Sequence, residues 1–154
     1  MKERKLSPWL LETIFFFLVL GQESLRLSWR TAKEKLPVSA GLQDFYYYYF
    51  GDFVNGFVIA YLVDGLSNLL LFQKQSSRTY YTIATIRIDK YRNAVLSALI
   101  ASLIVFIYEL GWTPISTTSD LLDVPGGVLG ALMYLLVRYL SLRFMENKAD
   151  TINK

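Results

Sequence analysis

The stretch from Ala94 to Ile107 constrains this chain more than any other part of its sequence. It contains no charged side chain and only two serines, so it offers no polar face with which a soluble helix could meet water. Together with its flanks it forms an apolar block over 94–112, close to the ~20 residues that a helix needs to cross ~30 Å of hydrocarbon. The pattern therefore predicts a membrane-spanning helix.

Three further apolar blocks accompany this one. Hydrophobic residues make up 53% of the 154 positions and charged residues 19%, against roughly 25% charged residues in a typical soluble domain. No repeat or linker marks a second domain. We therefore expect an all-α fold, a polytopic transmembrane helical bundle of about four membrane-spanning helices, forming a single membrane domain over 1–154. The predicted helices cover 8–29, 45–72, 94–112 and 121–142.

The first block differs from the other three because its strongly apolar part is short. A signal peptide would end in a small-residue cleavage site, whereas Gln22 and Glu23 follow here. We interpret the block as a retained N-terminal helix. An amphipathic helix from Glu23 to Leu36, lying at the membrane surface, is an additional possibility. The alternative to four spans is three spans with an interfacial first block.

Lys and Arg in the short loops indicate the orientation. With four spans, twelve basic residues fall on the side of both termini and four on the other, and the loop from Thr113 to Ser119 has none. This predicts cytoplasmic termini. The four exceptions lie between the first two blocks. On the cytoplasmic side, the segment from Thr79 to Ile88 has strand-like composition, although a short surface helix is also compatible with it.

Composition also excludes several kinds of chemistry. The chain has no Cys and no His, which removes disulfides, thiol chemistry, Cys/His zinc sites and an imidazole base. We predict no metal ligands and no cofactor. The net charge of +3 comes from clusters between apolar blocks rather than from one face, so nucleic acid is not an expected partner.

Acidic residues in or beside the spans are the informative polar features, because each is costly unless paired, hydrated or protonated. If neighbouring helices are antiparallel, one set meets at the outer end of the bundle as a candidate binding cluster. Headgroup water is a simpler explanation for Asp120 and Glu109. The candidate residues are Asp52, Asn55, Glu109, Asp120 and Asp123.

Two other patterns predict helix packing. Asp64 and Asn68 are four residues apart in the inner half of the second span, where we expect them to hydrogen-bond a neighbouring helix. Gly126, Gly127 and Gly130 open the last helix with small-residue spacing, which favours close approach of another helix.

The stretch from Phe106 to Gly130 resembles the VanZ-like family of small bacterial integral membrane proteins. In that family a helix ends in a glutamate, an outer loop follows, and an Asp-x-x-Asp segment opens the last helix. Glu109 matches the glutamate and Asp120 and Asp123 match the acid pair, while Gly127 stands where asparagine is expected. The match is firm over 106–137. It implies the bacterial plasma (inner) membrane and a cell-envelope role, without an established reaction.

Three hypotheses for function follow. The first is a VanZ-like protein whose outward-facing acidic cluster binds a cation, a cationic headgroup or an envelope precursor, with membrane lipids as partners. The second is an accessory or assembly subunit of a larger membrane complex, with other membrane-protein subunits as partners. The third is an enzyme that uses two carboxylates as acid and base on a lipid-linked substrate. No nucleophile or phosphate-binding loop supports the third hypothesis, so we expect a binding role rather than catalysis.

Overall fold

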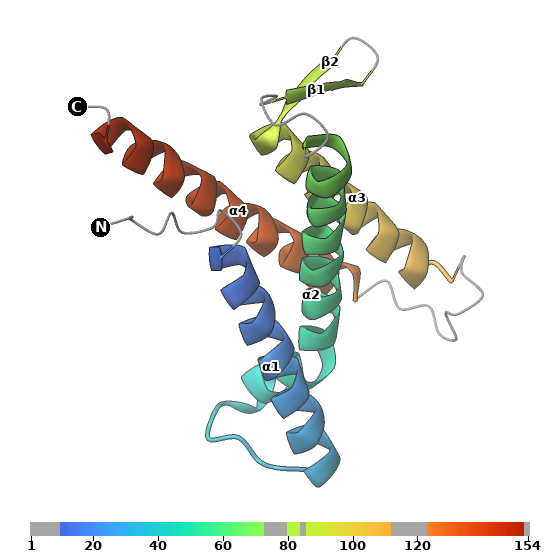
Figure 1. Ribbon diagram of the computed structural model, residues 1–154. Coiled ribbons are helices and arrows are strands. Elements are labelled where there is room, and N and C mark those ends of the chain that lie inside the picture. Colours follow the sequence, from blue (N-terminus) through green and yellow to red (C-terminus); the bar gives the residue numbers. More distant parts are fainter. Residues whose placement is uncertain (1–9, 73–79, 84–85, 112–122, 153–154) are drawn as a thin grey trace.

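The computed structural model describes residues 10–72, 80–83, 86–111 and 123–152. Four long helices dominate it, and a short antiparallel hairpin lies between the second and third (Figure 1). The helices are α1 (Leu10–Ala32), α2 (Ala40–Ser67), α3 (Lys90–Glu109) and α4 (Val124–Ile152). One π-helical turn, η1 (Asn68–Phe72), extends α2, and the hairpin pairs β1 (Tyr80–Ile83) with β2 (Ile86–Asp89).

The all-α transmembrane bundle predicted from the sequence is confirmed. Three of the described helices contain segments long and apolar enough to cross a membrane: Ala40–Leu70, Lys90–Glu109 and Val124–Phe144. Only 33% of the most apolar window of α3 is buried inside the protein. Its remaining apolar side chains face outward, as lipid-facing residues do.

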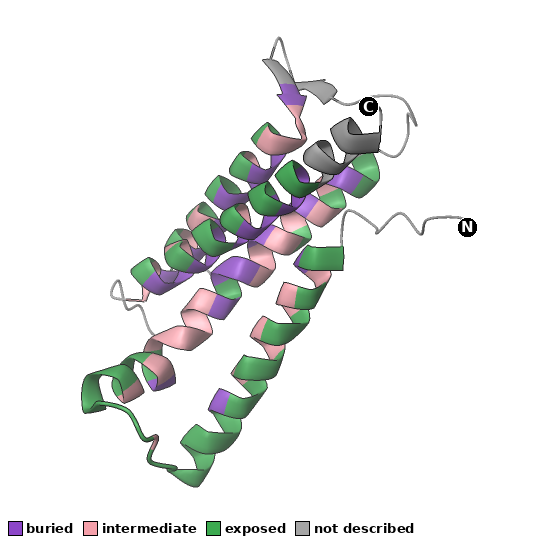
Figure 2. Ribbon diagram, turned by 90° about the vertical axis from the view of Figure 1, so that its left-hand side faces the viewer, coloured by how far each residue is buried: buried purple, intermediate pink, exposed green. Residues whose placement is uncertain are grey.

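Helix α1 is not among these three. Its 23 residues would extend ~34 Å, which is long enough to span, but Glu12, Glu23, Arg26 and Arg30 lower its hydropathy. It packs along α2 in the antiparallel direction, since Thr13 lies near Tyr61. Figure 2 shows α1 as mostly exposed, whereas buried residues concentrate where α2, α3 and α4 face one another.

The helix ends differ from the predicted ends for local reasons. Helix α2 begins at Ala40 rather than at residue 45, directly after Ser39, whose backbone is extended at the N-cap position. Helix α3 begins at Lys90, where the Asp89 side chain accepts a hydrogen bond from the Arg92 amide at 2.9 Å. It ends at Glu109 rather than at residue 112, and Gly111 adopts a left-handed conformation with φ 71° just beyond.

The first and last helices of the chain, α1 and α4, extend beyond their predicted C-terminal ends. Helix α1 continues to Ala32, three residues past its predicted end, and Lys33 terminates it with φ 56°. Helix α4 continues to Ile152, ten residues past its predicted end at 142. Hydropathy falls there, but the residues are still compatible with a helix, so the apolar block and the helix end at different places. The first residues predicted for the fourth helix, 121–122, lie outside the described part.

Small residues allow α2, α3 and α4 to approach closely. A Cβ atom added at Gly130 would lie 1.9 Å from the Phe53 carbonyl oxygen, and one at Gly56 would lie 1.8 Å from the Gly127 carbonyl oxygen. A Cβ at Gly127 itself would lie 2.5 Å from Val105 Cγ1. Gly126 is less tight, because its added Cβ would be 3.1 Å from the nearest backbone oxygen. The backbones of α2 and α4 are therefore in contact along this stripe.

The buried core continues from this glycine stripe toward the other end of the bundle. Its aromatic centre is the edge-to-face pair of Phe57 and Tyr134, with ring centroids 5.7 Å apart. Mostly small side chains surround the pair, which keeps the three helices close. The main cluster of buried hydrophobic residues consists of Phe57, Ala60, Ala98, Ala101, Ala131, Tyr134 and Val137.

Candidate functional site

Three acidic side chains from three separate segments of the chain meet at one end of the bundle. Asp52 lies on α2, Glu109 is the last residue of α3, and Asp123 directly precedes α4. One carboxylate oxygen from each lies within 4.8 Å of the others. Because α2, α3 and α4 alternate in direction, the end of α3 and the start of α4 come level with the middle of α2. We call these three residues the acidic triad.

A pocket of about 280 Å³ opens beside the triad between α2 and α3. Asp52, Asn55 and Glu109 form its polar side. The other side is mostly apolar, and two of its residues on α3, Ile104 and Tyr108, are also exposed on the surface of the bundle. Its lining residues there are Ile59, Ile104, Val105 and Tyr108. The pocket thus combines carboxylates with a hydrophobic wall.

The arrangement of the triad suits a cation. Calcium-like ions bind carboxylate oxygens at about 2.3–2.6 Å, so two ligand oxygens of one ion are at most about 5 Å apart. The oxygens of the triad meet that limit. Three carboxylates at this separation also repel one another, and a bound positive charge would relieve the repulsion. The sequence predicts no metal ligands, whereas the geometry brings together three residues that could hold a metal ion.

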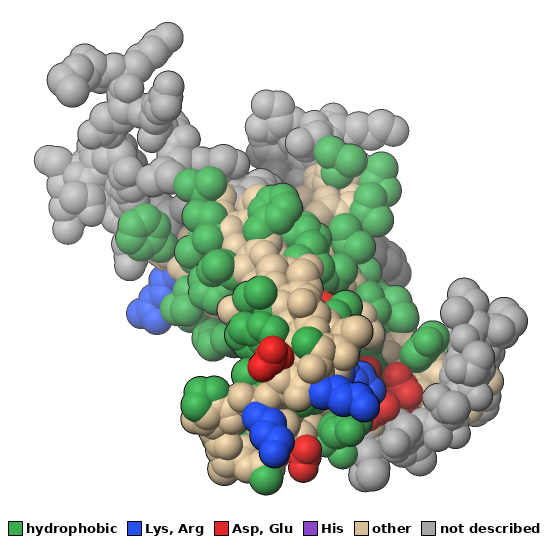
Figure 3. All heavy atoms as spheres, turned by 90° about the horizontal axis from the view of Figure 1, so that it is seen from below, with side chains coloured by type: hydrophobic (Ala, Val, Ile, Leu, Met, Phe, Trp, Pro, Cys, Tyr) green, Lys and Arg blue, Asp and Glu red, His purple; other side chains and the backbone are tan. Residues whose placement is uncertain are grey.

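The other candidate residues are placed as follows. Asn55 is exposed and lies one turn from Asp52, on the wall of the same pocket. Glu109 is the most buried member of the triad, with 6% of its surface exposed. Asp120 lies outside the described residues. Figure 3 looks at this end of the molecule, where acidic and basic side chains lie side by side among hydrophobic ones.

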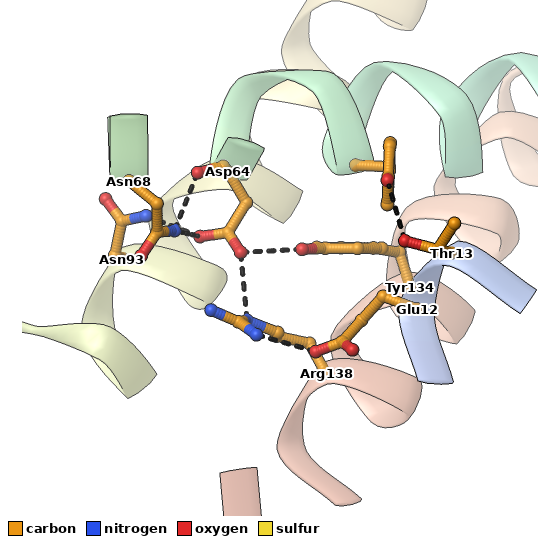
Figure 4. Close-up of polar contacts among 8 residues, drawn as sticks. Glu12, Thr13, Asp64, Asn68, Asn93, Tyr134 and Arg138 are labelled. Atoms are coloured by element: carbon orange, nitrogen blue, oxygen red, sulfur yellow. Dashed lines mark hydrogen bonds and ion pairs between the residues drawn. The ribbon is translucent and has the colours of Figure 1, made fainter. Parts of the chain in front are cut away.

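A second polar cluster lies deeper in the bundle, and the sequence pattern does not predict it (Figure 4). Arg138 of α4 lies between two carboxylates, with Nη1 2.6 Å from Glu12 Oε1 and Nε 3.0 Å from Asp64 Oδ2. The contact with Asp64 is an ion pair rather than a hydrogen bond, because the Nε–H bond makes no aligned hydrogen bond. At most 1% of the surface of each of these three residues is exposed.

Asp64 is the centre of this cluster. The Tyr134 hydroxyl donates to its Oδ2 at 2.6 Å, and Asn93 Nδ2 donates to its Oδ1 in a short contact. Asn68 Nδ2 donates to Oδ1 at 3.1 Å and to the Asp64 backbone carbonyl at 2.7 Å. Asp64 therefore makes the contacts to neighbouring helices that the sequence predicted for the pair, whereas Asn68 bonds Asp64 itself.

The buried network joins all four helices, with Glu12 from α1, Asp64 from α2, Asn93 from α3 and Arg138 from α4. Asp64 is twelve residues from Asp52 along α2, so the network lies ~18 Å from the acidic triad. Glu12 and Arg138 were visible in the sequence as charges within apolar blocks. Their spacing of 126 residues gives no sign that they pair, and Arg138 is buried although it is one of the twelve basic residues on the side of the termini.

The fold and these two clusters define a class of protein, a helical membrane bundle with an ionic interior and an acidic pocket at one end. No family model matches the chain, and no curated protein or solved structure matches it.

Proposed function

We propose that the protein is a VanZ-like membrane protein that binds a cationic ligand in the pocket beside the acidic triad. The observation that carries the proposal is the convergence of carboxylates from α2, α3 and the start of α4 within 4.8 Å. A divalent metal ion and a lipid ammonium headgroup both carry the positive charge that the three carboxylates would bind. The apolar wall formed by Ile59 and Ile104 would accept the acyl part of a lipid but is not needed by an ion.

Terbium luminescence tests the site directly, because Tb³⁺ replaces Ca²⁺ and is sensitised by nearby tyrosine, and Tyr108 lines the pocket. We expect saturable Tb³⁺ binding by the purified protein in nanodiscs. Removal of one carboxylate by Asp52→Asn, Glu109→Gln or Asp123→Asn should weaken binding at least about tenfold, since ligand charge count sets affinity at such sites. The matched control is Asp44→Asn, which removes an exposed acid on the same helix α2.

Competition for the bound Tb³⁺ distinguishes a metal ion from a lipid headgroup as the ligand. Displacement of Tb³⁺ by Ca²⁺ but not by lipids with ammonium headgroups indicates a metal site, and the reverse indicates a headgroup site. Equal weakening by Asp44→Asn and the triad variants, or wild-type binding by all of them, contradicts the proposal. A stoichiometric protein partner copurifying over the pocket would favour the accessory-subunit hypothesis instead.

We further propose four spans in the bacterial plasma membrane, with both termini cytoplasmic and the acidic triad facing outward. The antiparallel packing of α1 on α2 supports α1 as a span, and the β1–β2 hairpin and the end of α4 lie at the same end of the molecule (Figure 1). Two of the four basic residues that this topology places outside lie on α1 and have partners in the protein. Arg26 is buried against Glu23, and Arg30 stacks 5.1 Å from the Tyr48 ring centroid.

Cysteine labelling tests the orientation of α2, α3 and α4, since the natural chain has no Cys. A membrane-impermeant maleimide added to intact cells should label Lys35→Cys, between α1 and α2. It should label Lys148→Cys, near the end of α4, only after permeabilisation. Labelling of both variants in intact cells, or of Lys148→Cys alone, would refute the orientation.

A further inference from the structure

The way α1 docks sets it apart from the other helices. Over its described length its buried side chains are both charged, Glu12 and Arg26. They are fourteen residues apart, which places them ~21 Å apart on nearly the same face of the helix. Glu12 reaches Arg138 in the buried network. Arg26 lies at the other end of the helix, level with the acidic triad.

Hydrogen bonds hold the Arg26 guanidinium in one position. Its Nε and Nη2 donate to the two carboxylate oxygens of Glu23 at 2.7 and 2.6 Å, and its Nη1 donates to the backbone carbonyl of Tyr47 on α2. Only 5% of its surface is exposed. A methyl group added at Gly51 would lie 3.0 Å from Nη2, so the guanidinium covers this glycine.

Gly51 directly precedes Asp52, a member of the acidic triad. The charge of Arg26 therefore lies next to the residue that precedes Asp52, and it weakly attracts the Asp52 carboxylate. It would repel a cation arriving in the pocket. Glu23 opposes both effects, since its carboxylate pairs with the same guanidinium. The absence of a side chain at Gly51 is what allows Arg26 to approach this closely.

We infer that Arg26 is a positioning residue that sets the affinity of the acidic pocket for cations, acting as an internal counter-ion whose strength Glu23 reduces. The inference rests on the proposed function. It assigns to α1 a role in binding although α1 contributes no residue to the triad or to the lining of the pocket.

Two neutralising variants are expected to act in opposite directions on Tb³⁺ affinity in nanodiscs. Arg26→Gln removes a positive charge and leaves Glu23 unpaired beside the pocket, so binding should tighten about three- to tenfold. Glu23→Gln leaves Arg26 uncompensated, so binding should weaken by a similar factor. Both differences should shrink as salt is raised. Arg26→Lys loses the bidentate contact with Glu23 but keeps the positive charge. Because the charge sets the effect, the affinity should stay within about twofold of wild type.

The matched control is Arg30→Gln, one turn further along α1. It removes the same charge from an exposed position and should leave the affinity within about twofold of wild type. If Arg26 only anchors α1, then Arg26→Gln and Glu23→Gln both loosen the helix and shift the affinity in the same direction. That result, or an effect of Arg30→Gln equal to that of Arg26→Gln, overturns the inference.

The triad variants keep the two proposals distinguishable. If Asp52→Asn abolishes Tb³⁺ binding while Arg26→Gln and Glu23→Gln bind as wild type does, the pocket is a cation site and only the inference about Arg26 is wrong. If Asp52→Asn binds as wild type does, the proposed function itself is wrong. A melting curve for each variant shows that the bundle is intact before affinities are compared.

Discussion

Replacing Arg138 with glutamine should destabilise the bundle by about 3–5 kcal/mol, the usual cost of removing one partner from a buried ion pair. The variant leaves the carboxylates of Glu12 and Asp64 without their cation, at positions where both are fully buried. Equilibrium unfolding of the purified protein in mixed micelles measures the change. Arg143→Gln removes an exposed arginine five residues later on the same helix and should change stability by less than about 0.5 kcal/mol.

A second variant isolates the contribution of α1 to this network. Glu12→Gln removes the partner of Arg138 on α1 but leaves the ion pair between Arg138 and Asp64, so the loss should be smaller than for Arg138→Gln. If Arg138→Gln and Arg143→Gln had the same free energy of unfolding, the buried network would not stabilise the bundle.

Replacing Gly130 with valine should separate α2 from α4 and cost about 3 kcal/mol or more, at the upper end of the range for overpacked sites. The added Cβ would lie 1.9 Å from the Phe53 carbonyl oxygen. Backbone atoms cannot rotate away as a side chain can, so the two helices must move apart. The same unfolding measurement reports the loss, and a longer α2–α4 distance between paired spin labels reports its cause.

Gly65→Ala is the matched control on α2. No atom lies within 4 Å of the Cβ that it adds, and alanine favours the helix over glycine by about 0.5–1 kcal/mol, so this variant should be neutral or slightly stabilising. Wild-type stability of Gly130→Val, with an unchanged distance between the spin labels, would contradict the close packing of α2 on α4.

The acidic triad could be predicted from the sequence because the position of each acid along its helix determines at which end of the bundle it lies. Asp52 stands where α2 comes level with the end of α3, and Glu109 and Asp123 flank one loop, so antiparallel neighbours bring the three together. Position along a helix did not reveal Arg26, because a basic residue near a helix end resembles any interfacial charge. Its relation to the triad depends on Gly51, whose missing side chain makes room for the guanidinium.

By itself the sequence determined that this chain forms apolar helices of membrane-spanning length, because hydrocarbon length and the need to satisfy backbone groups leave few other solutions. It did not determine how each helix is rotated about its axis. Helices such as α3 are apolar on every side, so no polar stripe shows which face turns inward. Only the tertiary structure paired Glu12 with Arg138, 126 residues away, and placed Gly56 against Gly127. Contacts between helices decide these rotations, and each such contact depends on two segments far apart in the chain.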